Sequence, residues 1–164
     1  MRRHFWPIWL VTGLAGLVGY AAPELQTRIV YKEHGDFVRL SEFFNGREDS
    51  SGRAIVRSQP NSRTGLYFSL NISGGVGQLP EGAKVVLDLV HPILPEVKAF
   101  ELIAPRTPVD SREMLVGLTG DDWSSPKGKP VAWRVRILGA SGGVLAAEQS
   151  FLWGGPKVVS ASPQ

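Results

Sequence analysis

The sequence predicts an all-β protein, a single antiparallel β-sandwich of about seven strands that follows a signal or anchor segment. Between residues 64 and 153, apolar and polar residues alternate in short runs, which is typical of strands with one buried face. Glycine, proline and serine clusters separate these runs, as turns between antiparallel strands require. The chain has 164 residues and no cysteine, so it is long enough to bury a core without disulfides.

The first 22 residues differ in character from the rest of the chain. Arg2 and Arg3 give a positive start, and residues 5–22 carry no charge and end in small residues. This layout predicts a secretory signal peptide over residues 1–21, cleaved after Ala21. The alternative is an uncleaved membrane anchor, since eighteen uncharged residues are near the lower limit for crossing a bilayer. Either segment predicts export to the periplasm or cell surface, with membrane contact only through residues 1–22 if they are retained.

The charge balance argues against a nucleic-acid partner. Removing residues 1–21 takes two arginines from the 18 basic residues and leaves 16 against 15 acidic ones, a net charge of +1. A nucleic-acid-binding domain is expected to keep a strong positive excess.

Residues 22–63 form a polar, arginine-rich N-terminal segment. Thirteen of the forty residues from 24 to 63 are charged. Two short apolar runs, 28–33 and 54–58, predict one or two edge strands. Between them, LSEFFNG (40–46) predicts one helical turn with Ser41 as N-cap and Gly46 at its end, followed by a loop over 46–53.

Residues 64–153 are predicted to form the core of the sandwich with six strands. These are expected over 64–73, 83–91, 96–104, 112–120, 131–138 and 144–153, and the tail 154–164 shows no pattern. The alternation predicts these inward-facing side chains: Leu66, Phe68, Leu70, Ile72, Val85, Leu87, Leu89, Met114, Val116 and Leu118.

The stretch WRVRILGASGGVLAAEQSFLW (133–153) is predicted to be a hairpin. Trp133, Val135 and Ile137 share one face, whereas Arg134 and Arg136 take the other. The glycine-rich GASGG (139–143) supplies residues that adopt positive φ, and strands joined by so short a link pair antiparallel.

Seven or eight strands with glycine and proline in the turns resemble an immunoglobulin-like or fibronectin-III-like sandwich, with a jelly roll or open barrel as the alternative. Trp133 is the candidate core tryptophan, but the Cys…Trp…Cys arrangement of antibody domains is absent because there is no cysteine. Residues 28–153 also resemble small exported bacterial proteins of unassigned role, a resemblance that implies no activity.

The sequence predicts no catalytic residue, metal or cofactor, and therefore a non-enzymatic protein. His34 and His91 both fall in turn or strand-end contexts. The pattern G-x-S-x-G occurs only in GASGG (139–143), which is predicted to be a hairpin turn and lacks the strand-to-helix context of a nucleophile elbow. Asp121 and Asp122 are adjacent carboxylates, but they lack the Asp-rich loop of a calcium site.

Two binding surfaces are predicted instead. Arginine with interleaved aromatic residues is an interface composition, which makes Arg39, Phe43, Phe44 and Arg47 the candidate partner-binding residues. The partner would be another envelope protein. The competing interpretation is a solvated edge whose arginines pair with neighbouring acids.

The second predicted surface consists of Trp123 and Trp153, which would stack on sugar rings of a polysaccharide. This makes a carbohydrate-binding module the alternative function. The competing interpretation is packing at strand ends.

Overall fold

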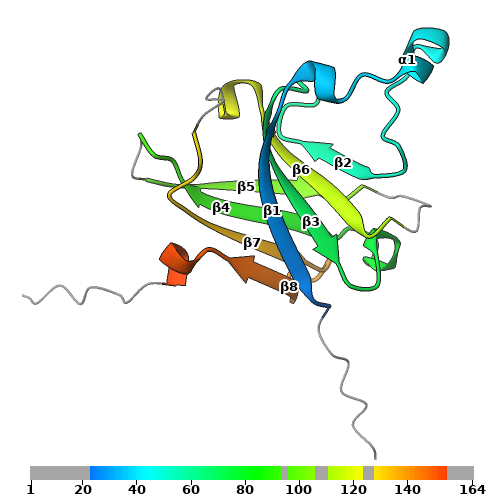
Figure 1. Cartoon of the computed structure of the whole chain (residues 1–164). Coiled ribbons are helices and arrows are strands. Elements are labelled where there is room, and N and C mark those ends of the chain that lie inside the picture. The colour runs from blue at the N-terminus through cyan, green and yellow to red at the C-terminus, as the bar shows by residue number, and fades with distance from the viewer. Residues whose placement is uncertain (1–22, 94–95, 106–110, 124–127, 155–164) are drawn as a thin grey trace, which may run out of the picture.

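The fold is an all-β sandwich of two four-stranded sheets, as predicted. The computed structural model describes residues 23–93, 96–105, 111–123 and 128–154 (Figure 1). Sheet A has the order β1-β3-β6-β2, and sheet B has the order β5-β4-β7-β8. The strands of sheet A are β1 (Leu25–Lys32), β3 (Gly65–Ile72), β6 (Glu113–Thr119) and β2 (Ala54–Arg57). Those of sheet B are β5 (Val97–Ile103), β4 (Lys84–Val90), β7 (Ala132–Leu138) and β8 (Val144–Gln149).

The core lies between the sheets and is built by the predicted alternation. All ten predicted inward-facing residues of β3, β4 and β6 belong to one buried cluster. Trp133 packs against this cluster at its margin, with its ring 5.9 Å from that of Phe68 in an edge-to-face arrangement. Trp133 itself is half-buried, so it closes one side of the core and does not lie at its centre.

Six of the eight strands can be matched to the strand order of an immunoglobulin-like sandwich, and β2 at the far edge of sheet A does not follow that order. Strands β1, β3 and β6 occupy the places of A, B and E, and β4, β7 and β8 occupy those of C, F and G. The expectation that all strands run antiparallel is wrong for β2, which pairs parallel to β6 from Ala54↔Met114 to Arg57↔Gly117. Because 21 residues separate β1 from β2, the chain has enough length to cross sheet A and enter its far edge in either direction.

The hairpin prediction is confirmed. β7 pairs antiparallel with β8, and the turn closes through the Gly139 N–H, which donates to the Gly143 carbonyl at 2.8 Å. Gly142 has φ of +82°, a conformation that side chains with a Cβ rarely adopt. The two N-terminal apolar runs also form strands, and β1 and β2 lie at the two edges of sheet A, as predicted.

One α-helix and four 3-10 turns complete the described residues. The turns are η1 (His34–Asp36), η2 (Val76–Gln78), η3 (Gly120–Asp122) and η4 (Phe151–Gly154). The helix α1 (Leu40–Asn45) ends at Gly46, whose φ of +65° fits the predicted C-terminal position. Ser41 was expected to be its N-cap, but Arg39 occupies that position and the Ser41 hydroxyl instead donates to Asp49 Oδ2 at 2.6 Å.

The predicted signal segment 1–21 and all of the predicted tail except Gly154 fall outside the described residues. Within the described ranges, no helix is both long and apolar enough to span a membrane.

Candidate functional site: the arm on sheet A

A second, smaller core covers part of the outer face of sheet A. It consists of Phe37, Tyr67 and Leu115, with Val30 and Ile55 packed against them. Tyr67 was expected on the polar face of its strand, yet it is fully buried because Phe37 covers it, with the two rings 5.0 Å apart. The chain between β1 and β2 therefore crosses the outer face of the sheet and is packed onto it.

Gly117 allows this close packing. A Cβ at this position would lie 2.5 Å from Cε1 of Tyr67, which is closer than carbon atoms approach one another. The absence of a side chain at Gly117 lets the Tyr67 ring lie flat over β6.

The hydroxyl of Tyr67 joins two segments of the chain. It donates to the backbone carbonyl of Arg63 at 2.7 Å and accepts from Arg57 Nε at 2.8 Å. Arg57 also lies over the Phe37 ring, with its guanidinium carbon 4.9 Å from the ring centroid. Burial raises the pKa of the Tyr67 phenol, so this hydroxyl stays protonated and keeps its donor at neutral pH.

Residues 38–53, which we call the arm, are attached to the sandwich by four ion pairs among the described residues, and two of them are also hydrogen bonds. Arg57 donates to both carboxylate oxygens of Glu48, one of them at 2.8 Å, and Arg63 Nη1 donates to Glu42 Oε2 at 2.8 Å. The hydrogen bond from Arg57 holds the pKa of Glu48 below its usual range, and that from Arg63 does the same for Glu42. Burial opposes the charge of Arg57, but its bonds to Glu48 and Tyr67 outweigh this and raise its pKa.

Inside the arm, Asp49 fixes the loop that follows α1. It accepts hydrogen bonds from the Ser41 hydroxyl at 2.6 Å and from the Ser51 N–H at 2.8 Å, and these bonds lower its pKa. Arg39 Nε donates to the Ser51 hydroxyl at 3.3 Å, which brings the two ends of the arm together.

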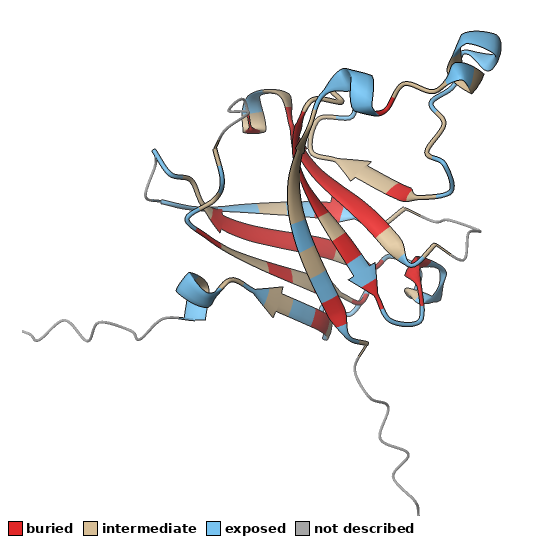
Figure 2. Cartoon of the chain, in the orientation of Figure 1, coloured by how far each residue is buried: buried red, intermediate tan, exposed pale blue. Residues whose placement is uncertain are grey.

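The helix α1 carries its apolar face into solvent. Leu40, Phe43 and Phe44 are spaced i, i+3, i+4, so they share one face of the helix. Their exposed fractions are 74%, 77% and 84%, and Figure 2 shows most of the helix as exposed, beyond the edge of the sandwich. Glu42 on another face binds Arg63, which leaves the apolar face turned away from the sheet.

The four predicted partner-binding residues thus belong to one projecting element. Arg39 precedes α1 and is half-buried, and Arg47 follows it and is exposed. The two aromatic residues lie between them. The region therefore has features of both interpretations made from the sequence, a contact surface and a solvated edge with internal ion pairs. Arg57 and Arg63 pair with acids at the base of the arm, whereas Arg47 and the two phenylalanines are exposed at its tip.

The predicted carbohydrate residues are placed differently. Trp123 was expected to present an exposed ring, and this is wrong: it is 1% exposed and its ring lies 4.7 Å from that of His91. Trp153 is half-buried in η4, and the guanidinium of Arg134 lies 5.0 Å from its ring centroid. The two tryptophans do not form a shared stacking platform, since one of them is buried.

The outer face of sheet B carries an ion cluster with a structural role. The carboxylate oxygen Oδ2 of Asp88 accepts from Arg134 Nε and Nη2 and from Arg136 Nη2, at 3.0, 2.9 and 2.9 Å. Asp88 is 5% exposed, and these bonds compensate the burial of its charge.

The groups considered for catalysis lie in separate elements. His34 is in η1, His91 follows β4, and Asp121 and Asp122 are in η3. Across the ranges that the structure describes, no group of three or more His, Asp or Glu side chains is arranged to hold a metal ion.

Comparisons of the chain with protein families, with curated proteins and with solved structures found no match. The fold and the site define the class of protein on their own, namely a β-sandwich whose first inter-strand crossing carries a projecting apolar helix.

Proposed function

We propose that the protein is exported and acts without bond-making chemistry, by binding another protein of the cell envelope through the tip of the arm. The observation that carries the proposal is the exposure of Leu40, Phe43 and Phe44 on one face of a helix that is firmly attached at its opposite side. The predicted signal segment supports export.

The exposure of the apolar face of α1 is energetically unfavourable for the isolated protein, and this supports a binding role. A short amphipathic helix normally gains its stability by burying its apolar face. In this protein the helix is held by Glu42, Glu48 and Asp49, so the apolar face is left available. Contiguous exposed apolar side chains rimmed by polar ones mark interaction sites on soluble proteins.

The composition of the tip indicates what kind of partner fits. Two adjacent phenylalanines supply large apolar surface for a pocket on the partner, which is the usual chemistry of interface anchors. Arg47 and, at the base of the helix, Arg39 add positive charge, so an apolar pocket with an acidic rim is complementary.

Site-specific photocrosslinking in intact producing cells tests this proposal. A photoreactive phenylalanine analogue is placed at Phe43, and the matched control carries it at Phe151, which is 92% exposed in η4. We expect one dominant protein adduct from position 43 that is absent from position 151. Substituting Arg47→Glu should reduce the adduct, whereas Arg47→Lys should preserve it.

Two results would refute the proposal. Identical adduct patterns from positions 43 and 151 would mean that the tip has no specific partner. No protein adduct from position 43, with the protein correctly folded and located in the envelope, would have the same meaning.

A further inference from the structure

A polar trough runs along the outer face of sheet A beside the arm. Every second residue from Glu24 to Lys32 points outward from β1 or from the residue before it. Glu24 and Gln26 line one cavity of about 210 Å³, and Arg28, Val30 and Lys32 line a second cavity of the same volume. At about 3.3 Å per residue, these five positions extend over about 26 Å. The two cavities therefore follow one another along β1.

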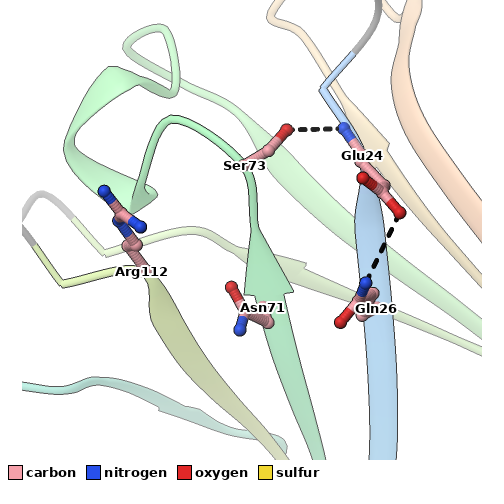
Figure 3. Close-up of a pocket in the computed structure, with 5 residues that line it drawn as sticks. All are labelled: Glu24, Gln26, Asn71, Ser73 and Arg112. Atoms are coloured by element: carbon pink, nitrogen blue, oxygen red, sulfur yellow. Dashed lines mark hydrogen bonds between the residues drawn. The ribbon is translucent and has the colours of Figure 1, made fainter.

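The first cavity is lined by polar side chains from three places in the chain. Figure 3 shows Gln26 of β1, Asn71 of β3 and Arg112, which directly precedes β6, around the same hollow. Glu24 accepts a bond from Gln26 Nε2 at 3.4 Å, and its backbone N–H donates to the Ser73 hydroxyl at 2.6 Å. Arg112 has no ion-pair partner among the described residues, so its guanidinium is free to bind a ligand.

The second cavity has an excess of positive charge. Its one carboxylate, Glu113, is already engaged, because the Ser69 hydroxyl donates to it at 2.6 Å and Arg53 Nε lies 3.5 Å away. Arg28 and Lys32 stand on the opposite wall and have no acidic partner within the described part of the chain. Lys32 Nζ lies over the Phe37 ring at 5.6 Å from its centroid, a cation–π contact that supplies no counter-charge.

The trough offers side chains but no backbone groups. The strand β3 forms its floor and is hydrogen-bonded to β1 on one side and to β6 on the other. An extended peptide recognises a sheet by pairing with an open edge. The open edge on this side belongs to β1, and its unpaired backbone groups point sideways in the plane of the sheet and not into the trough. The four cations Arg28, Lys32, Arg53 and Arg112 outnumber the two carboxylates Glu24 and Glu113 in the lining. Together with the amide and hydroxyl groups, they suit a chain that presents carboxylates and hydroxyls.

From this arrangement we propose that the trough binds an extended anionic polysaccharide. Arg28 and Lys32 in one cavity and Arg112 in the other would contact its carboxylates, and Gln26, Asn71 and Ser73 would contact its hydroxyls. The site is separate from the tip of the arm and does not depend on the function proposed for the tip.

Binding of alginate, a linear polyuronate, to the purified protein tests the inference by titration calorimetry. The parallel probes are dextran, which is neutral, and citrate, which is a small carboxylate. We expect alginate to bind, with affinity that weakens as salt rises, and dextran and citrate to bind at least about tenfold more weakly.

A pair of matched variants locates the site. Arg28→Gln with Arg112→Gln removes one cation from each cavity, and Lys98→Gln with Lys129→Gln removes the same charge from exposed positions outside the trough. We expect the first pair to weaken alginate binding about tenfold or more and the second pair less than about twofold. Neither arginine side chain makes a hydrogen bond or ion pair within the described residues, so thermal unfolding should be unchanged, and Arg28→Gln alone provides a second, milder test.

Several outcomes would overturn the proposal. Absence of alginate binding, or equal binding of dextran, would remove the anionic polysaccharide. Citrate binding as tightly as alginate would indicate a small-anion site. Equal losses in the two double variants would attribute binding to overall charge and not to the trough.

Discussion

Tyr67→Phe tests whether the second core on sheet A is a stabilising part of the fold. The substitution removes only the hydroxyl, which bonds to the Arg63 carbonyl at 2.7 Å and to Arg57 Nε at 2.8 Å. The neutral bond contributes about 1 kcal/mol, and the bond to the charged guanidinium contributes about 1.5–3 kcal/mol. The side chain of Arg57 is only 8% exposed, so water does not readily replace the lost partner. We therefore expect a loss of about 2–4 kcal/mol in the free energy of unfolding.

The assay is urea denaturation followed by tryptophan fluorescence and circular dichroism, with the slope of the transition compared between variants. Tyr31→Phe is the matched control, because Tyr31 is half-buried and its hydroxyl makes no hydrogen bond within the described residues. It should change the free energy of unfolding by less than about 0.5 kcal/mol. If Tyr67→Phe is as mild as the control, the hydroxyl does not join the arm's base to the sheet in the way described.

Three further predictions follow from other parts of the structure. Trp123→Ala should cost about 3–5 kcal/mol of unfolding free energy, and Trp133→Ala about 2 kcal/mol, since only the first ring is fully buried; equal losses in denaturation would contradict the assigned burial. Asp88→Asn should cost about 2 kcal/mol because it leaves two half-exposed arginines of β7 without a counter-charge, and an unchanged denaturation midpoint would count against this. The pKa values of Glu42 and Glu48 are lowered by folding, so their contribution is present above the ordinary carboxyl pKa near 4.5 and is lost as pH falls through the lowered values. In NMR spectra, the amide signals of the arm should therefore shift toward unstructured positions at a higher pH than those of the core strands. If the arm and the core strands lose their native signals at the same pH, the arm does not detach separately.

The strands of the sandwich were predictable because the physics that selects them is local. In β3, the alternation of Leu66, Phe68 and Leu70 with polar residues reports one buried face directly. The glycine-rich turn at 139–143 likewise indicates its hairpin, because the link is too short for any other pairing. The end of α1 at Gly46 was predictable from the residue type alone, because glycine readily adopts the left-handed conformation that ends a helix.

The spacing of Leu40, Phe43 and Phe44 also held a signal, since i, i+3, i+4 defines one helix face. The sequence does not say whether such a face is buried or exposed, because that depends on what lies opposite. The ion pairs of Glu42 and Glu48 with Arg63, in the connection between β2 and β3, and with Arg57 of β2 decided it, because they attach the helix through its polar side.

What the sequence by itself determined was the set of strands, their inward faces, the main hairpin and the candidate residues of the arm, all of which depend on residues close together in the chain. Only the tertiary structure decided the parallel direction of β2, the burial of Tyr67 and Trp123, and the trough beside β1. These features depend on which segments meet across the sheet. Phe37 covers Tyr67, which lies thirty residues further along the chain, and the sequence around each residue gives no sign of this contact.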